Sequence, residues 1–266
     1  MTNTNEQDER LWTQPKASLS DVTLQDIPDI HKKCFLFDID GVLCDPQQPI
    51  SAAMKTAVNS IARTSMVYFV TGNSMTKSID LLSGVVRDGL FCNSADELRS
   101  HSGNLLWTEA GIPPLPPRIE NTLQMLCGND NNHFGNRIEW RSPRMINFSK
   151  CGRFANAEQR ASADISWRED AVNLINLMYP EASAVIGGAV SIDIYSKGAD
   201  KSRAALYVNK FLNKEFVFIG DKTFSGGNDY PIVEYCVNNP ANIALTTFGA
   251  DYTLMLIDKI LKRMEW

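Results

Sequence analysis

The chain has 266 residues, of which 44% are hydrophobic and 21% are charged, so it can bury a sizeable core and is not generally disordered. Its formal net charge is −5 and it has no long basic run, which argues against nucleic acid or an anionic membrane surface as the main partner. The six cysteines form no CxxC pair, the start is polar and acidic, and no apolar segment is long enough to span a membrane. We therefore expect a cytoplasmic protein without structural zinc or disulfides.

The first part of the chain predicts a polar arm followed by alternating strands and helices. Residues 1–30 have few apolar anchors and are expected to form the arm. Predicted strands lie at 34–38, 66–70 and 89–92, and predicted helices begin near Ser51, a candidate N-cap, and near Met75. Ile79 shares the helical spacing of Met75 and is expected on the buried face. This alternation is typical of a parallel sheet with helices on its faces.

The pattern changes after "GIPPLPP" (111–117), where four prolines indicate a linker. Alternating residues then predict two antiparallel strands around "RIEW" and "RMINFS", with Trp140 in the core of this module. An amphipathic helix is expected to bury Leu174 and Met178, and a hairpin is expected to turn at Gly187-Gly188. After residue 196 the strand and helix alternation resumes, with Phe211 on the apolar face of one helix.

These patterns predict an α/β fold with two modules. The core is a doubly wound parallel sheet made from residues 31–112 and 197–266. An α+β cap, residues 113–196, is inserted between the two halves of the core. Such a cap is expected to close over the core, with hinges in the proline-rich stretch and near Ser196-Lys197-Gly198.

Polar side chains follow several strands of the predicted core. Asp38 and Asp40 come after the first strand, Thr71 after the second and Asp221 after "FVFIG", while Lys201 opens the preceding helix. Because the carboxyl ends of parallel strands meet at one edge of a sheet, we expect these side chains to lie together. Carboxylate oxygens are hard ligands that favour Mg²⁺ as the bound cation, and Lys201 adds a second positive charge.

An aspartate in such a site can accept a phosphoryl group. In this interpretation Asp38 is the nucleophile, and Mg²⁺ and Lys201 neutralise the phosphoryl oxygens. Thr71 donates a hydrogen bond to the phosphoryl group, and Asp40 acts as the general acid and base. The alternative for an isolated DxD is a turn or helix cap without a metal, but the convergence of Thr71, Lys201 and the late acidic loop favours a catalytic site.

The "DIDG" motif, Thr71, Lys201 and the late acidic loop together resemble the four motifs of the haloacid dehalogenase (HAD) superfamily. "FIGDKTFSGGNDYPI", "IEWR", "MINFSKCGR" and "GGAVSIDIY" resemble the eukaryotic-type phosphomannomutases more specifically. The resemblance implies a metal site at Asp38, Asp40, Asp221 and Asp229, with Asp40 contributing its carbonyl oxygen. It implies cap contacts to a sugar phosphate from Arg141, Arg153, Ser191 and Asp193. It also implies a homodimer joined through the cap.

The sequence departs from that family at positions that matter for phosphate binding. Gln47 and Phe134 stand where the mutases carry arginines, and Tyr235 stands where they carry an acidic residue of a second cation site. A mutase must hold a sugar with two phosphates, so the missing cations weaken the mutase interpretation specifically. Arg137 or Arg144 is expected to replace them. The alternative role for Arg141 and Arg153 is a solvated strand face, and for Asp229 a helix cap.

Three functions follow from this interpretation. The leading one is a mutase that interconverts hexose 6- and 1-phosphates, as in mannose 6-phosphate to mannose 1-phosphate. The second is a sugar-phosphate phosphatase on the same scaffold, in which water resolves the phosphoaspartate. The third is a sugar-phosphate sensor without turnover, which the adjacent carboxylates Asp38 and Asp40 argue against, since a binder gains nothing from their repulsion.

Overall fold

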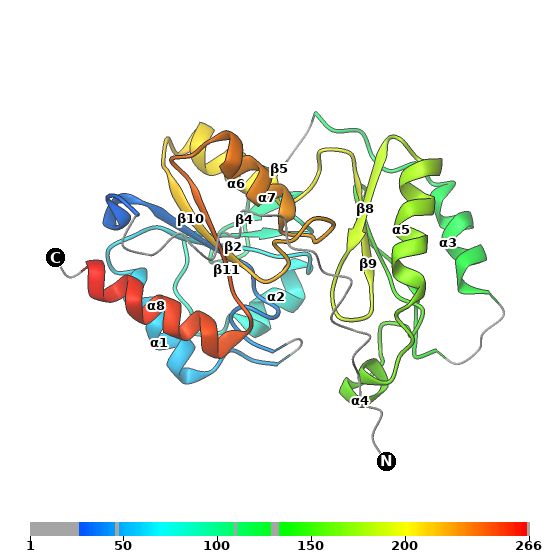
Figure 1. Ribbon diagram of the computed structural model, residues 1–266, viewed down its shortest axis with the longest axis horizontal. Coiled ribbons are helices and arrows are strands. Elements are labelled where there is room, and N and C mark those ends of the chain that lie inside the picture. Colours follow the sequence, from blue (N-terminus) through cyan, green and yellow to red (C-terminus); the bar gives the residue numbers. More distant parts are fainter. Residues whose placement is uncertain (1–26, 46–47, 109–110, 129–132, 265–266) are drawn as a thin grey trace, which may run out of the picture.

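The computed structural model describes residues 27–45, 48–108, 111–128 and 133–264 (Figure 1). The predicted arm, residues 1–30, therefore lies mostly outside the described residues. Its last residues do not belong to an arm, because Ile27 and Ile30 are buried in the main hydrophobic core. Within the described ranges no helix is both long and apolar enough to cross a membrane.

The larger sheet, on the left-hand side of Figure 1, has seven strands in the order β11-β10-β1-β2-β3-β4-β5. Its strands are β1 (Cys34–Phe37), β2 (Val67–Val70), β3 (Gly89–Cys92), β4 (Glu97–Arg99), β5 (Leu105–Thr108), β10 (Phe216–Gly220) and β11 (Ile243–Thr246). The five strands from β11 to β3 are parallel, as predicted. The antiparallel hairpin β4–β5 at the edge was not predicted, because its short strands show little periodicity.

Helices cover both faces of this sheet. They are α1 (Ala52–Ile61), α2 (Met75–Leu81), α6 (Ser202–Phe211), α7 (Tyr230–Asn238) and α8 (Ala250–Met264), with a short 3₁₀ helix, η3 (Ile30–Lys32), before β1. α1 and α8 pack in one core with the side chains of Phe35 and Phe37, while α6 and α7 pack in the other with Leu36. Successive residues of β1 therefore serve opposite layers, which explains why the whole strand is apolar.

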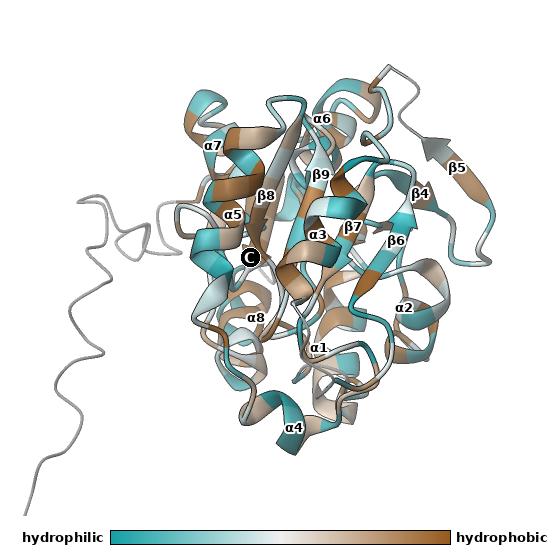
Figure 2. Cartoon of the chain, turned by 90° about the vertical axis from the view of Figure 1, so that its right-hand side faces the viewer, coloured by the Kyte–Doolittle hydropathy of each residue, from teal (hydrophilic) through white to brown (hydrophobic). Residues whose placement is uncertain are grey.

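The second sheet of the molecule has four antiparallel strands in the order β6-β7-β9-β8. Its elements are β6 (Ile138–Ser142), β7 (Met145–Phe148), β8 (Ala182–Ile186) and β9 (Ile192–Ser196), with helices α3 (Ile119–Cys127), α4 (Ala157–Ala161) and α5 (Trp167–Met178). Figure 2 shows α3 and α5 in front of this sheet, and their apolar residues share one core with it. The β8–β9 hairpin turns through Gly187-Gly188 as predicted. α3 and α4 were not predicted.

Several side chains predicted to be buried are exposed. Ile79, Leu174, Met178 and Phe211 have exposed fractions of 37–55%. Met178 and Phe211 are the last residues of α5 and α6, and helical spacing alone does not define how far the covering layer extends. Trp140 is also outside the core, since its ring lies at the surface and its Nε1 donates to Glu120.

The two sheets are joined by direct contacts as well as by two connections. Ile186 at the end of β8 donates its backbone N–H to Gly226 O at 3.0 Å. Arg144 forms an ion pair with Asp96 after β3. A Cβ at Gly198 would lie 3.8 Å from Cδ1 of Ile112, so the two connections between the sheets run close together. The predicted hinges are thus adjacent, an arrangement that suits rotation of one module about a common axis.

Candidate active site

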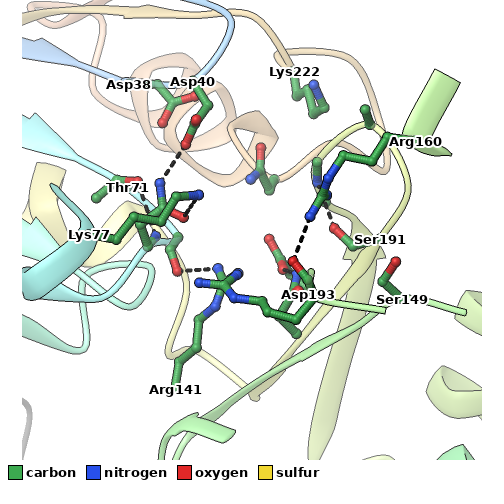
Figure 3. A pocket seen from close by; sticks show the side chains of 18 of the residues that line it. Asp38, Asp40, Thr71, Lys77, Arg141, Ser149, Arg160, Ser191, Asp193 and Lys222 are labelled. Carbon is green, nitrogen blue, oxygen red and sulfur yellow. Dashed lines mark hydrogen bonds between the residues drawn. The ribbon is translucent and has the colours of Figure 1, made fainter. Parts of the chain in front are cut away.

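A cavity of about 170 Å³ is lined by residues of both sheets (Figure 3). Asp38, Thr71 and Asp221 follow β1, β2 and β10, three neighbouring parallel strands, so their positions at one edge follow from the sheet order. Ser191 and Asp193 reach the cavity from the hairpin of the other sheet. The predicted convergence of distant polar residues is therefore present.

Three carboxylates meet at the floor of this cavity, which Asp38 and Asp221 line, while Asp229 is fully buried beneath it. One oxygen atom from each of Asp38, Asp221 and Asp229 lies within 4.8 Å of the others. The fully buried ammonium of Lys201 bridges two of them, at 2.9 Å from Oδ1 of Asp38 and 2.6 Å from Oδ1 of Asp229. Among the described residues, the carboxylate of Asp40 does not belong to this acidic group. Asp40 was predicted to contribute its backbone carbonyl to the metal site rather than its side chain.

The charges on this floor are not balanced. Burial would lower the pKa of Lys201, but Asp229 and Asp38 raise it well above its ordinary value, so the lysine stays charged. Burial raises the pKa of Asp38 to about 8; Lys201 opposes this rise, and Asp229 and Asp221 add to it. Two ammonium groups, that of Lys201 and that of Lys222, whose Nζ lies 2.8 Å from Oδ2 of Asp221, cannot neutralise three carboxylates. The site therefore favours either a proton on Asp38 or a further cation among the three acids.

The backbone approaches the carboxylate of Asp221 closely at Gly41. Gly41, directly after Asp40, has φ +82°, and a Cβ built there would lie 2.6 Å from Oδ2 of Asp221. A side chain at position 41 would collide with the carboxylate, and a residue other than glycine would be strained in that conformation. The glycine of the "DIDG" motif thus allows the loop after β1 to approach Asp221 closely.

The carboxylate of Asp40 is bonded to an amide, whereas that of Asp38 is paired with Lys201. Its Oδ2 accepts a hydrogen bond of 2.5 Å from Nδ2 of Asn73, and Asn73 N donates to Oγ1 of Thr71 at 3.1 Å. Thr71 is buried and lines the cavity. Asp40 is therefore held at the cavity wall beside the acidic group, in the position that a proton donor and acceptor requires.

The opposite wall of the cavity comes from strand β6, which carries Arg141, and from the loop after β7, which carries Arg153. Arg141 and Arg153 both contact Oε2 of Glu139, at 3.2 and 3.0 Å, and both line the cavity. Arg141 also donates to the carbonyl of Gly72 across the boundary between the sheets. These arginines are therefore partly buried and directed inward, which contradicts the alternative of a solvated strand face.

The two other residues predicted on this wall are held by neighbouring groups. Ser191 Oγ accepts from Gly188 N at 3.1 Å. The buried carboxylate of Asp193 accepts a hydrogen bond of 2.7 Å from Asn147 Nδ2. The hairpin thus presents a hydroxyl and a carboxylate, groups suited to sugar hydroxyls.

The prediction that Arg137 or Arg144 replaces the missing arginines is wrong. Arg137 donates to Cys127 O at 2.8 Å, and Arg144 is paired with Asp96; neither lines the cavity. Arg144 lies in the turn between β6 and β7, outside the alternation of either strand, and its side chain reaches Asp96 of the other module. Gln47 lies outside the described residues, and Phe134 is at the surface.

Other polar residues line the cavity without having been predicted. They are Asn73, Lys77, Asn147, Ser149, Arg160, Lys222 and Asn228. The spacing of Asn73 and Lys77, four residues apart at the start of a helix, was a usable signal for that pair. Arg160 lies in the short helix α4, which has no clear periodicity, so only the tertiary structure brings its side chain to the site.

The comparisons with known proteins agree with one another. The profile described as "Eukaryotic phosphomannomutase" matches residues 123–263. Phosphomannomutase of Oryza sativa subsp. indica is 31% identical over 214 residues, which are 75% of this chain and 85% of that protein. Phosphomannomutase of Arabidopsis thaliana is 30% identical over 237 residues, 82% of this chain and 92% of that protein.

Among solved structures, a phosphatase of the haloalkanoate (HAD) enzyme superfamily from Bacteroides thetaiotaomicron superposes with a TM-score of 0.59. The match covers 90% of this chain and 97% of that one at 14% sequence identity, so it concerns the fold. It confirms the predicted fold class of a parallel α/β core with an inserted module.

Proposed function

Because this chain belongs to the eukaryotic phosphomannomutase family, we propose that it transfers phosphoryl groups on a hexose phosphate, converting mannose 6-phosphate to mannose 1-phosphate. The observation that carries the proposal is the buried group of Asp38, Lys201 and Asp229 beside a separately held Asp40. One carboxylate is placed to react with phosphorus and the other to move protons, which are the two roles that this chemistry needs.

The reaction proceeds in two halves. A carboxylate oxygen of Asp38 forms a bond to phosphorus while the bond from phosphorus to the sugar oxygen breaks, and Asp40 gives its proton to that oxygen. In the second half a sugar hydroxyl transfers its proton to Asp40 and attacks the phosphoaspartate, which regenerates Asp38. Lys201 neutralises the phosphoryl oxygens throughout, and Thr71 donates its hydroxyl proton to one of them.

The acidic group is suited to Mg²⁺, with Asp38 and Asp221 as carboxylate ligands, the carbonyl of Asp40 as a third, and Asp229 beside them. Both oxygens of Asp229 already accept hydrogen bonds, from Lys201 Nζ at 2.6 Å and Lys222 N at 3.1 Å, so its main role is to position those groups. When bound, the cation supplies charge neutralisation for the phosphoryl group. The excess negative charge of the three acids supports this assignment.

Replacing Gly41 by alanine is expected to weaken Mg²⁺ binding, since the new Cβ would collide with Asp221. Gly226→Ala is the matched control, because Gly226 has nearly the same φ, +86°, but a Cβ there meets nothing within 4 Å. We expect Mg²⁺ affinity, measured by titration calorimetry, to fall roughly 10-fold or more in Gly41→Ala relative to Gly226→Ala. Equal affinities in the two variants would contradict the metal site.

The cap arginines are expected to bind the sugar phosphate. Arg141→Gln should raise KM for mannose 1-phosphate by about 10- to 100-fold, the value of one charge-assisted hydrogen bond, and should affect a small aryl phosphate much less. Arg137→Gln is the control, since Arg137 is bonded to Cys127 O away from the cavity. Equal increases in KM for both substrates would remove Arg141 from the substrate site.

The second candidate is a sugar-phosphate phosphatase. It is favoured by one observation, that neither Arg137 nor Arg144 reaches the cavity to replace the missing arginines. The test is to incubate the protein with mannose 1-phosphate, Mg²⁺ and a hexose bisphosphate primer, and to follow the products by ³¹P NMR. A mutase yields mannose 6-phosphate and a phosphatase yields free phosphate. A protein that yields neither is the sensor, and the proposed function is then wrong.

Two further properties belong to this proposal. A homodimer through the cap is supported by exposed apolar side chains on α3 and α5, namely Met125, Leu177 and Met178. A cytoplasmic location is supported by the cysteines, all six of which are free thiols in the structure.

A further inference from the structure

Lys77 is a cation of the active-site cavity that has no role in the mechanism above. It lies in the first turn of α2 and lines the cavity. Among the described residues its Nζ donates to one acceptor, Oδ1 of Asn73 at 3.0 Å. An ammonium has three donors, so this bond leaves donors available to a ligand. Figure 3 shows the Lys77 side chain between Thr71 and Arg141, with Arg160 reaching in from the opposite wall.

The charges around Lys77 are mostly of the same sign. Arg141, Arg153 and Arg160 line the same cavity from the other module. Burial lowers the pKa of Lys77; Asp40 opposes this effect, while Arg153, Arg141 and Arg160 lower the pKa further. Glu139 offsets part of the charge through its contacts with Arg141 and Arg153. This wall of the cavity is therefore arranged for an anion, and the repulsion between the two modules is relieved when one binds.

A second cation, Lys201, is already bonded to the carboxylate that is proposed to receive the phosphoryl group. Lys201 is fully buried beneath the floor of the cavity, where it pairs with Asp38 and Asp229. Asn73 is bonded to both Asp40 and Lys77, and Figure 3 shows the Lys77 side chain on the side of Asp40 that faces Arg141. A ligand that carries two phosphoryl groups would place one at Asp38 and the other toward the arginines, on the side where Lys77 lies.

We propose that Lys77 is the core-side cation for the phosphoryl group that is not at Asp38, and that this group is held jointly by Lys77 and the cap arginines. The proposal rests on the proposed function and deepens it, because it supplies a cation for the site that Arg137 and Arg144 do not reach. Since Lys77 belongs to one module and the arginines to the other, the bound phosphoryl group links the two modules and stabilises the closed cap.

The alternative is that Lys77 acts only through Asn73 to hold Asp40. A binding measurement without turnover separates the two. In EDTA, glucose 1,6-bisphosphate and a small aryl monophosphate are titrated into the full chain by calorimetry, using the natural protein, Lys77→Met and Lys77→Arg. Lys210→Met is the matched control, because Lys210 is an exposed lysine on α6 away from the cavity.

Lys77→Met is expected to weaken binding of the bisphosphate by about 10- to 100-fold, as for loss of one charge-assisted hydrogen bond. The aryl phosphate, which has no second phosphoryl group, should lose much less affinity, and Lys77→Arg should restore most of the bisphosphate affinity. Equal losses for both compounds, or no loss for the bisphosphate, would overturn the role of Lys77. If the natural protein binds neither compound, the proposed function itself is wrong, and this proposal with it.

Discussion

Asp38→Asn is expected to abolish phosphoryl transfer and, at the same time, to make the metal-free protein more stable at alkaline pH. The amide cannot form the phosphoenzyme, so turnover should fall by roughly 1,000-fold or more. The gain in stability has an electrostatic cause. The folded protein raises the pKa of Asp38 to about 8, so ionising this buried carboxyl costs free energy that an amide does not cost.

The pH dependence follows from the direction of that shift. A raised pKa means that the contribution of Asp38 to stability is fully present below the ordinary carboxyl pKa of 3.8 and is lost as the pH rises through about 8. The melting temperature of Asp38→Asn, measured in EDTA, should therefore exceed that of the natural protein by an amount that grows between pH 5 and 8.5. Each kcal/mol gained corresponds to about 2–4 °C for a chain of this size.

Saturating Mg²⁺ should reduce this difference, because a cation bound at the three acids stabilises the ionised Asp38 of the natural protein. The control is Asp258→Asn, which removes a carboxylate paired with Lys262 on the surface of α8. Its melting temperature should show no such pH trend. Retained turnover in Asp38→Asn would refute the nucleophile assignment, whereas a variant less stable than the natural protein at pH 8.5 would refute the electrostatic account.

Lys201→Met is expected to be the most destabilising single change at the site. It removes the cation that bridges Asp38 and Asp229 and leaves two carboxylates facing each other in a fully buried position. Breaking a buried ion pair in this way costs about 3–5 kcal/mol. Because Lys201 lowers the pKa of Asp38, its loss raises that pKa further, so the cost should increase between pH 5 and 8.

Urea unfolding at pH 5 and pH 8 measures this effect. Lys222→Met is the matched control, since it removes a lysine paired with Asp221 that is about a quarter exposed, for which a cost of about 0–1 kcal/mol is expected. The double variant Lys201→Met/Asp229→Asn removes the uncompensated charge and should recover part of the stability lost in Lys201→Met. The account is wrong if Lys201→Met costs no more than the control, or if the double variant is less stable than the single one.

The sequence alone determined the parts of this protein whose structure is local. Apolar runs that end in Asp38, Thr71 and Asp221 predict buried parallel strands with polar ends, and strands in this arrangement bring those ends to one edge. Gly41 follows from the same logic, because the turn after β1 needs a positive φ. The fold class and the predicted residues on the floor of the cavity were therefore accessible from residue order.

Only the tertiary structure decided which cations reach the cavity. Arg144 was expected there and instead pairs with Asp96, while Arg160 lines the cavity without a distinctive pattern in the sequence, and Lys77 has only its spacing from Asn73 as a signal. A long, flexible side chain can reach several groups from one backbone position, so its partner depends on how the two sheets face each other. That orientation is set by contacts between residues far apart in the chain, such as Ile186 with Gly226, which no local periodicity encodes.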